Sequence, residues 1–256
     1  IFIKGNHDLN LNNESRMDAL TPIYKNLNHP NLYYLDSTDI FVIGGINFSV
    51  FDIADKVENY IPAKDIQSDL PKVALFHGAI NSSTTDAGFK VSNSNLPISI
   101  FDGYDLALLG DIHKKQFLNK EKTIHYPGSL IQQNFGEAYK NHGYSVWDVK
   151  TLKSKFTHIH NDYGFYTVKI NSGVLPSIDD IPKFPKLRLR TKNTTQAELK
   201  NILVDVKKVA TVSDVMIIKD DKVTAGDCKL AKAITRDTRD VEYQNELISD
   251  YIERNF

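Results

Sequence analysis

The residues Leu106-Ala107-Leu108-Leu109-Gly110-Asp111-Ile112-His113 form the most informative stretch of the chain. Leu106 to Leu109 is an apolar run typical of a buried strand, which we expect to end at the glycine. Asp111 and His113 are two residues apart, so on an extended backbone both side chains point to the same side. The stretch predicts two metal ligands at the mouth of a buried strand, although a polar strand end that faces water has the same short pattern.

Two other apolar runs upstream end in similar polar residues. Gly5-Asn6-His7-Asp8 follows Ile1-Phe2-Ile3, and His77-Gly78 follows the run from 72 to 76. Taken alone, the first of these is as readily a plain polar turn. Together, the three strand ends predict that Asn, Asp and His side chains converge on one edge of one sheet.

Composition sets the bounds within which this site must work. The chain has 256 residues, enough for one large domain and a smaller one, with a net charge of -1 and 25% charged residues. The single cysteine, Cys228, excludes an internal disulfide and favours a reducing compartment. No apolar run approaches the roughly 18 residues that span a membrane. The chain begins at Ile1 inside an apolar run, from which we expect a fragment that lacks its true N-terminus.

The first part of the chain is expected to be rich in strands. Thr21-Pro22 resembles an N-cap followed by a first-turn proline, which predicts a short helix to about Leu27. Residues 81 to 97 are rich in Ser, Asn and Thr and predict a long surface loop beside the site. The strands are expected at residues 32–35, 40–43, 46–51, 72–76 and 104–109, with a hairpin formed by 143–149 and 155–159. His125 and His142 fall at loop or edge positions in this scheme and gather no partners.

Beyond about residue 162 the pattern changes to a β-α-β unit. Its strand, residues 186–192, places Lys186, Arg188, Arg190 and Lys192 on one face and two leucines on the other. A capping box starts at Thr195 and precedes a helix with an apolar stripe to residue 209, and residues 214–219 form the next strand. The basic face is either a solvated, aggregation-resistant edge or a surface that meets DNA. A final amphipathic helix is expected over residues 241–256.

The residue types at the strand ends point to metal-assisted hydrolysis. Asn, Asp and neutral His are ligands that suit Mn, Fe, Zn or Mg. Two such ions can activate a water molecule and hold a phosphate during in-line attack. His7 is the candidate for a non-ligating group that acts on the phosphate, with Asp8 orienting its ring. Lys114 and Lys115 are either solvated charges or contacts to a phosphate backbone.

The ordered motifs resemble a known family. Gly5-Asn6-His7-Asp8, His77-Gly78 and Gly110-Asp111-Ile112-His113 resemble the last three of the five metal motifs of calcineurin-like metallophosphoesterases. The stretches 111–116, Tyr126-Pro127-Gly128-Ser129 and Phe135-Gly136-Glu137 resemble its SbcD / Mre-type DNA repair exonuclease branch. The resemblance covers about residues 1 to 150, and the β-α-β unit matches the capping domain of that branch in layout only.

The resemblance implies an α/β (α+β) fold, a four-layer α/β/β/α sandwich with a small α+β capping domain. It implies two divalent metal ions, usually Mn, with Mg, Fe or Zn as alternatives. Asn6, His77 and the position of Asp111 would bind one ion and His113 the other, and His7 would act on the scissile phosphate. The expected domains are residues 1–162 (nuclease), 163–236 (capping and DNA-binding) and 237–256 (a helix that docks a partner).

Two departures from the family pattern bear on activity. The family usually has G-H-x-H where this chain has Gly110-Asp111-Ile112-His113, and the added carboxylate could shift the metal preference. The first two family motifs, D-x-H followed by G-D-x-x-D, would precede Ile1, because no G-D-x-x-D follows the D-x-H triplet Asp111-Ile112-His113 anywhere in the chain. We therefore expect these 256 residues alone to bind metal weakly and to hydrolyse little.

The expected function is that of a metal-dependent DNA exonuclease or endonuclease, acting in DNA repair or in viral or phage-type recombination. Lys114, Lys115, Arg188 and Arg190 are the candidate DNA contacts. The implied partners are DNA and an SbcC-like SMC-type ATPase, with a homodimer as a further expectation and no membrane. The compartment is the cytoplasm, in a bacterial, phage or viral context, or the nucleus. The alternatives are a general phosphoesterase acting on a small molecule or phosphoprotein, and a catalytically dead DNA-binding scaffold.

Overall fold

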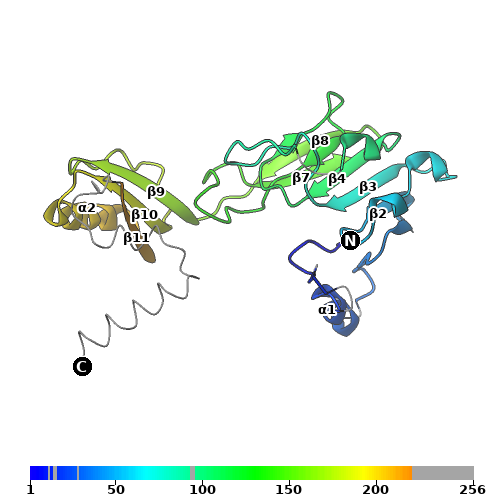
Figure 1. The fold of residues 1–256 in the computed structure, drawn as a ribbon, viewed down its shortest axis with the longest axis horizontal. Helices are drawn as coiled ribbons and strands as arrows, with labels where there is room; N and C mark the ends of the chain where they lie inside the picture. The colour runs from blue at the N-terminus through cyan, green and yellow to red at the C-terminus, as the bar shows by residue number, and fades with distance from the viewer. Residues whose placement is uncertain (11, 14–15, 28, 93–95, 221–256) are drawn as a thin grey trace, which may run out of the picture.

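The computed structural model describes residues 1–10, 12–13, 16–27, 29–92 and 96–220 and shows a mixed α+β fold (Figure 1). Its main sheet has six strands in the order β1-β2-β3-β4-β6-β5. Their bounds are β1 (Asp39–Ile43), β2 (Ile46–Phe51), β3 (Lys72–His77), β4 (Leu106–Gly110), β5 (Gln116–Phe117) and β6 (Ile124–Tyr126). The strands from β2 to β6 through the middle of the sheet are parallel, and β1 and β5 are antiparallel to their neighbours.

The parallel pairing of β3 with β4 places the two strand-end motifs side by side. In this register His77 lies opposite Gly110, directly before Asp111. Parallel neighbours end at the same edge of a sheet, so polar residues after each strand come together there. The expected convergence of these two strand ends is therefore confirmed.

One face of the main sheet carries the larger core. Side chains alternate along a strand, so Ala74 and Phe76 share this face with Ala107 and Leu109 of the neighbouring strand. Side chains of the 3-10 helix η3 (Ile98–Phe101) and of Tyr60 pack on this face, and two further 3-10 helices, η1 (Val57–Asn59) and η2 (Ala63–Asp65), lie on either side of Tyr60 in the sequence. Phe51 stacks on the ring of Phe101 at a centroid distance of 5.5 Å, which closes this core.

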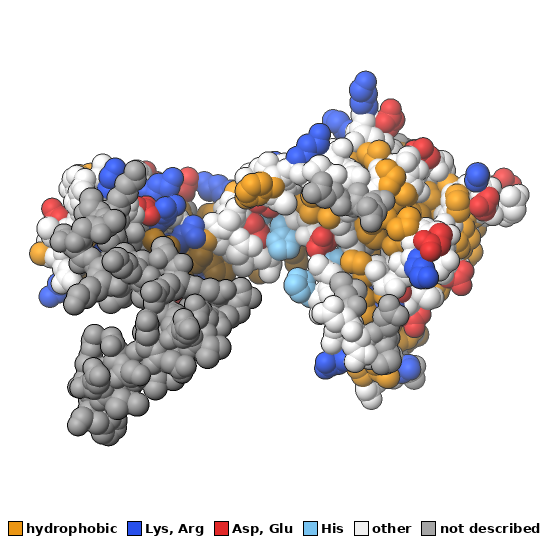
Figure 2. Space-filling model, in the orientation of Figure 1, with side chains coloured by type: hydrophobic (Ala, Val, Ile, Leu, Met, Phe, Trp, Pro, Cys, Tyr) orange, Lys and Arg blue, Asp and Glu red, His pale blue; other side chains and the backbone are white. Residues whose placement is uncertain are grey.

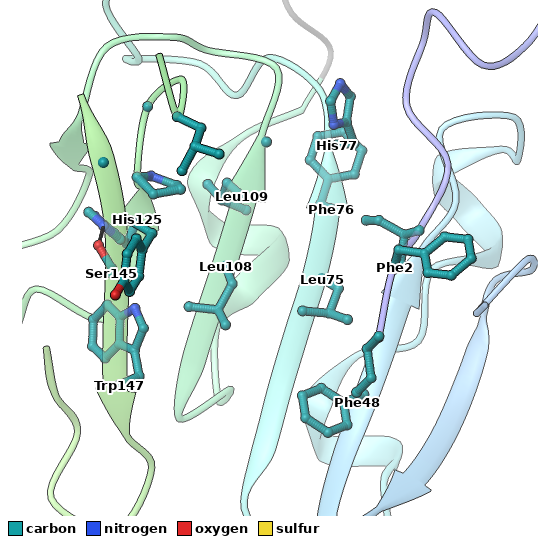
Figure 3. Close-up of a pocket in the computed structure, with 18 residues that line it drawn as sticks. Phe2, Phe48, Leu75, Phe76, His77, Leu108, Leu109, His125, Ser145 and Trp147 are labelled. Atoms are coloured by element: carbon teal, nitrogen blue, oxygen red, sulfur yellow. Dashed lines mark hydrogen bonds between the residues drawn. The ribbon is translucent and has the colours of Figure 1, made fainter. Parts of the chain in front are cut away.

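The opposite face of the main sheet forms the floor of an apolar trough of about 520 Å³ (Figure 3). Leu75 and Leu108 project into it from the middle of the floor. One wall is the segment of residues 1–3, which contacts residues 33–35 through a single bridge between Phe2 and Tyr34. The other wall is a hairpin of β7 (Gly143–Asp148) and β8 (Lys153–His158). The side chain of His77 stands at one end of the trough.

His125 lies at the β7 wall of this trough and is almost fully buried, with 2% of its surface exposed. Its Nδ1 lies 3.1 Å from the Gln116 carbonyl oxygen and its Nε2 lies 2.8 Å from the Ser145 hydroxyl. Its ring stacks on Phe117 and meets Trp147 edge-on. The sequence-based expectation that this histidine gathers no partners is wrong, because it lies inside strand β6 and not at an edge.

Residues 163–220, here called the C-terminal module, form a separate three-stranded sheet that packs against one helix. Its sheet has the order β11-β10-β9, all parallel, with β9 (Tyr163–Asn171), β10 (Phe184–Lys192) and β11 (Asp214–Lys219). Helix α2 (Gln196–Val209) covers one face, and its Ile202 and Val206 pack on the buried side chains of Leu187 and Leu189. The expected β-α-β unit and the alternation along β10 are confirmed.

The capping box before α2 is also confirmed. The Thr195 hydroxyl accepts a hydrogen bond from the Glu198 backbone N–H, and the Glu198 carboxylate accepts one from the Thr195 backbone N–H. These two bonds satisfy donors that a helix start otherwise leaves free.

Two expectations about segment ends need correction. Helix α1 (Leu20–Leu27) begins before Pro22, because the Asp18 carboxylate accepts hydrogen bonds from the Leu20 and Thr21 backbone N–H groups. Residues 1–3 and 32–35 form only the bridge between Phe2 and Tyr34 and no regular strands. The expected helix over 241–256, the whole expected domain 237–256 and the last part of the expected domain 163–236 lie outside the described residues, as does Cys228. Within the described part, no helix is long and apolar enough to cross a membrane.

Truncation of Leu189 to alanine should destabilise the C-terminal module. This side chain is fully buried between the sheet and α2. The cavity it leaves should lower the free energy of unfolding of the module by about 2–5 kcal/mol. Urea unfolding followed by circular dichroism measures this, while the one tryptophan, Trp147, reports separately on β7. Val204→Ala, at a residue 52% exposed on the same helix, is the matched control. Equal shifts of both signals in Leu189→Ala would show one cooperative unit in place of two domains.

The buried His125 should make stability depend on pH. Burial lowers the pKa of His125 from its usual 6.5 to about 4. Between these values the unfolded chain binds more protons than the folded one, so stability falls as pH falls from 6.5 towards 4. The slope from this one group is at most about 1.4 kcal/mol per pH unit. Thermal unfolding of wild type and His125→Gln across this range should give a flatter profile for the variant. Parallel profiles would contradict the assignment.

Candidate functional site

The imidazole of His77 lies between two glycine backbones from distant parts of the chain. A Cβ atom added to Gly5 would stand 2.8 Å from His77 Nε2, and one added to Gly110 would stand 2.6 Å from His77 Nδ1. Real Cβ atoms do not approach this closely, so only glycine allows both segments to reach the ring. The first and third predicted motifs thus meet at the second.

Three polar side chains gather around this point. Asn6 Nδ2 donates to Asp111 Oδ1 at 3.2 Å, and His77 Nε2 lies 4.0 Å from the same oxygen. The amide oxygen of Asn6 is buried and, among the described residues, has no hydrogen-bond partner. A buried amide oxygen without a partner is costly, at about 1–3 kcal/mol. Beside a carboxylate and an imidazole, this oxygen suits a divalent cation, so these three residues fit the expected ligand types.

The backbone at Asp111 is held in an uncommon conformation. Its φ is 88°, in the left-handed region that favours glycine. Such a conformation costs about 1–3 kcal/mol and persists only where the surroundings enforce it. Here it turns the chain sharply after β4 and places the carboxylate beside Asn6 and His77.

Burial lowers the pKa of His77, and the nearby Asp111 carboxylate partly opposes this shift. The charges of Asp8, His7 and His113 also act on the ring, with smaller effects than that of Asp111. A lowered pKa keeps the imidazole neutral, the form that binds a metal. Figure 2 shows histidine side chains gathered near the middle of the visible face with acidic side chains close to them.

The structure assigns Asp8 a different role from the expected one. Its carboxylate Oδ2 accepts a hydrogen bond from the Gly5 backbone N–H at 2.8 Å, which closes the turn that carries Asn6 and His7. Asp8 therefore shapes this turn, and the expectation that it bonds to the His7 ring is not met. His7 itself is exposed on the turn, next to Asn6.

His113 is held by a buried carboxylate on a loop more than twenty residues later. Its Nδ1 lies 2.8 Å from Glu137 Oε1, and the Glu137 side chain is only 3% exposed. The Ser129 backbone N–H also donates to the His113 carbonyl oxygen at 3.0 Å. The third predicted motif therefore depends on residues 127–137 for its geometry.

The Tyr126-Pro127-Gly128-Ser129 stretch positions both histidine-bearing loops. The buried Tyr126 hydroxyl donates to the Gly78 carbonyl oxygen at 2.6 Å and accepts from the Ile80 N–H at 3.1 Å, which fixes the loop after His77. A Cβ on Gly128 would stand 2.6 Å from the His113 carbonyl oxygen, and its φ is +82°. Glycine is thus required where the loop passes His113.

Sequence reasoning missed two residues close to this site. The Nδ1 atom of His142 lies 3.0 Å from the Ser129 hydroxyl oxygen. The expectation that His142 gathers no partners is therefore wrong. Burial is the main cause that raises the pKa of Asp86, and the negative charge of Glu137 adds to it. The charges of His113 and His142 act in the opposite direction. Asp86 belongs to the loop 81–97, which has no periodic pattern that could have singled it out.

The four candidate DNA-binding side chains differ in the contacts that their positive charges already make within the protein. Arg190 makes a bidentate ion pair with Asp220, with Nη2 to Oδ1 at 2.8 Å and Nε to Oδ2 at 2.9 Å. Arg188 lies over the Phe135 ring at 4.5 Å and donates to the Thr167 hydroxyl. Lys115 stands 3.8 Å from the centroid of the Phe156 ring, whereas the Lys114 side chain forms no hydrogen bond or ion pair with another described residue. Arg190 is therefore largely neutralised, and Arg188 joins the C-terminal module to the loop at Phe135.

Within the part of the chain that the structure describes, no group of three or more His, Cys, Asp or Glu side chains is arranged to hold a metal ion. The cluster at β3 and β4 has only His77 and Asp111 of these types, with Asn6 as the third polar group. The structure thus brings together Asn6, His77 and Asp111 and holds His113 nearby without completing a two-metal cage.

No protein-family model matches the chain. Over 224 residues, 84% of this chain, the sequence is 37% identical to an uncharacterized protein of Acanthamoeba polyphaga mimivirus. The chain spans only 16% of the length of that relative. The similarity therefore concerns part of a larger viral protein.

Substitution of Gly110 by alanine should displace the His77 ring. The backbone of Gly110 tolerates alanine, but the added Cβ would stand 2.6 Å from His77 Nδ1, and Gly5 blocks the other side of the ring. We expect a changed His77 Cε1–H signal in carbon–proton NMR spectra. Gly44→Ala, in the open turn between β1 and β2, controls for a general loss of stability. An unchanged His77 signal in Gly110→Ala would contradict the described packing.

Proposed function

We propose that this chain carries part of a metal-dependent DNA nuclease of the SbcD / Mre-type branch of calcineurin-like metallophosphoesterases. The observation that carries the proposal is the buried, unpartnered Asn6 amide oxygen beside Asp111 and His77 at the carboxyl edge of β3 and β4. Open parallel sheets bind ligands at this edge. The order of the motifs and the resemblance of residues 126–137 favour the nuclease branch.

In this proposal, Asn6, His77 and Asp111 hold one divalent ion, and His113 contributes to a second. Mn²⁺ suits the mixture of amide, carboxylate and imidazole ligands, with Mg, Fe or Zn as alternatives. Such ions activate water and stabilise charge on a phosphate. His7, exposed beside Asn6, protonates the leaving oxygen.

The same proposal includes the four-layer α/β/β/α sandwich and the domains 1–162, 163–236 and 237–256. Two groups of strands support it. The six-stranded sheet forms the floor of the trough, and the β7–β8 hairpin forms one of its walls (Figure 3). The proposed cellular setting is the cytoplasm or nucleus, with an SbcC-like ATPase and a second copy of the chain as partners.

DNA contacts are proposed at Lys114, Lys115, Arg188 and Arg190, with different contributions. Lys114, next to the metal ligand His113, has the freest charge of the four. Arg190 would have to exchange its ion pair with Asp220 for a phosphate. Lys186 and Lys192 share its face of β10 and are exposed, so they extend the basic surface.

A catalytically inactive DNA-binding scaffold is the second candidate. It is favoured by the direct hydrogen bond between Asn6 and Asp111 and by the absence, among the described residues, of a complete cage of His and acidic ligands. A scaffold of this kind would bind DNA with strong salt dependence and would not cleave it.

The two candidates are separated by metal binding and cleavage. We expect the 256-residue chain to bind Mn²⁺ weakly in calorimetric titrations, and Asn6→Leu to abolish that binding. Asn26→Leu, on the exposed side of α1, should bind as wild type does. With linear double-stranded DNA and Mn²⁺, we expect slow cleavage that His7→Ala reduces by about 10²-fold or more, as expected for loss of a general acid.

His160→Ala is the control for the cleavage assay, because that side chain is 84% exposed and lies in another part of the chain. DNA binding without Mn²⁺ binding or cleavage would favour the scaffold. Turnover of a small phosphodiester without any DNA binding would exclude both candidates.

A further inference from the structure

The carboxylate of Glu137 is buried and fully hydrogen-bonded, although it lies in a loop. Its Oε1 accepts from His113 Nδ1 at 2.8 Å and from the Asn134 amide at 2.8 Å. Its Oε2 accepts from the Ser129 hydroxyl at 3.0 Å and from the Gln133 backbone N–H at 3.1 Å. Four donors on two oxygens hold this carboxylate in one position.

The chemistry of this contact fixes where the His113 proton lies. An ionised carboxylate only accepts hydrogen bonds, so Nδ1 of His113 is the donor. In a neutral imidazole the other nitrogen, Nε2, then carries the lone pair. Among the described residues no hydrogen bond is formed by Nε2, and the His113 side chain is 44% exposed. The lone pair is therefore directed away from Glu137 and available to a ligand.

We infer that Glu137 is a positioning residue that fixes the ring orientation and the Nδ1–H tautomer of His113, so that Nε2 binds a metal ion. The identity of the ligand on Nε2 rests on the proposed function. The tautomer and the ring orientation rest on the hydrogen bonds alone. Carboxylate–histidine–metal arrangements of this kind raise the basicity of the histidine, and loss of the carboxylate typically weakens metal binding by about 10- to 100-fold.

The backbone of His113 is held by the same loop that holds its ring. Ser129 donates its N–H to the His113 carbonyl oxygen and its hydroxyl to Glu137. Gly128 allows this close approach, because a Cβ atom added at this position would collide with the His113 carbonyl oxygen. The ring and the backbone are thus fixed from one side by residues 128–137.

The loop that carries Glu137 is in turn fixed to the C-terminal module. The buried Gln132 amide donates to the Glu137 carbonyl oxygen and to the Phe165 carbonyl oxygen, each at 3.0 Å. The Phe165 N–H donates back to Gln132 Oε1 at 2.7 Å. Arg188 covers the Phe135 ring at 4.5 Å from β10. The position of His113 therefore depends on contacts that reach strand β9.

The test uses the whole 256-residue chain, labelled with ¹⁵N, without metal, at about pH 8, where an ordinary imidazole is neutral. Long-range ¹H–¹⁵N spectra should show the His113 ring of the wild type with a protonated Nδ1 and a free Nε2. In Glu137→Gln the acceptor has no charge, so the Nε2–H tautomer should become the main form. Titration of both proteins with Mn²⁺ should then show binding about 10- to 100-fold weaker in the variant.

Glu121→Gln is the matched control, because it makes the same change of charge at an exposed carboxylate between β5 and β6. It should keep the Nδ1–H tautomer. Glu137→Asp tests the position of the carboxylate if Glu137→Gln does not fold, and it should shift the tautomer part of the way. A Glu137 that serves stability alone would lower the melting temperature and leave the tautomer of His113 unchanged in every variant, which would overturn the inference. A tautomer switch without Mn²⁺ binding in the wild type would support the positioning role and overturn the metal ligand proposed for Nε2.

Discussion

The contact of the His77 ring with the backbones of Gly5 and Gly110 is the constraint on which the rest of the site depends. It joins the start of the chain to the ends of β3 and β4. Parallel pairing brings His77 and Gly110 to one sheet edge, but it does not bring residues 5–8 there. That requires the absence of a side chain at two positions, so that a third backbone can approach within van der Waals distance of the ring.

Periodicity predicted most of the regular structure because the relevant signals are local. The alternation along residues 186–192 and the capping box at Thr195 follow from which residues face the core and which satisfy a helix start. The start of α1 was misplaced because the Asp18 carboxylate competes with Thr21 as the capping group, and a sequence alone does not rank the two. The strand expected at residues 1–3 forms a single bridge, since strand formation requires a paired neighbour that local sequence does not identify.

The clustering of Asn6, His77 and Asp111 was predictable from sequence, and their supporting residues much less so. Asn6, His77 and Asp111 follow strand ends, a position that sequence can mark. Glu137 and His142 act through contacts with residues far away in the chain, and no periodic pattern marks them. The stretch 126–137 stood out only by its resemblance to a family. The structure supplies a physical reason for that stretch, because Tyr126, Gly128 and Glu137 each fix one histidine-bearing loop.

The unfavourable features of this fold are concentrated at one place. Asn6 keeps a buried amide oxygen without a partner, and Asp111 adopts a strained backbone conformation next to it. Each costs about 1–3 kcal/mol, and together they are comparable to a large share of the stability of a small domain. The larger core reaches this edge through Ile112, the residue after Asp111, whereas Asn6 belongs to neither core. Natural proteins retain such local conflicts mainly where function needs them. A cation bound by the Asn6 oxygen and the Asp111 carboxylate would remove the first conflict and make use of the second, which is why this sheet edge, and not the apolar trough beside it, is where we place the chemistry.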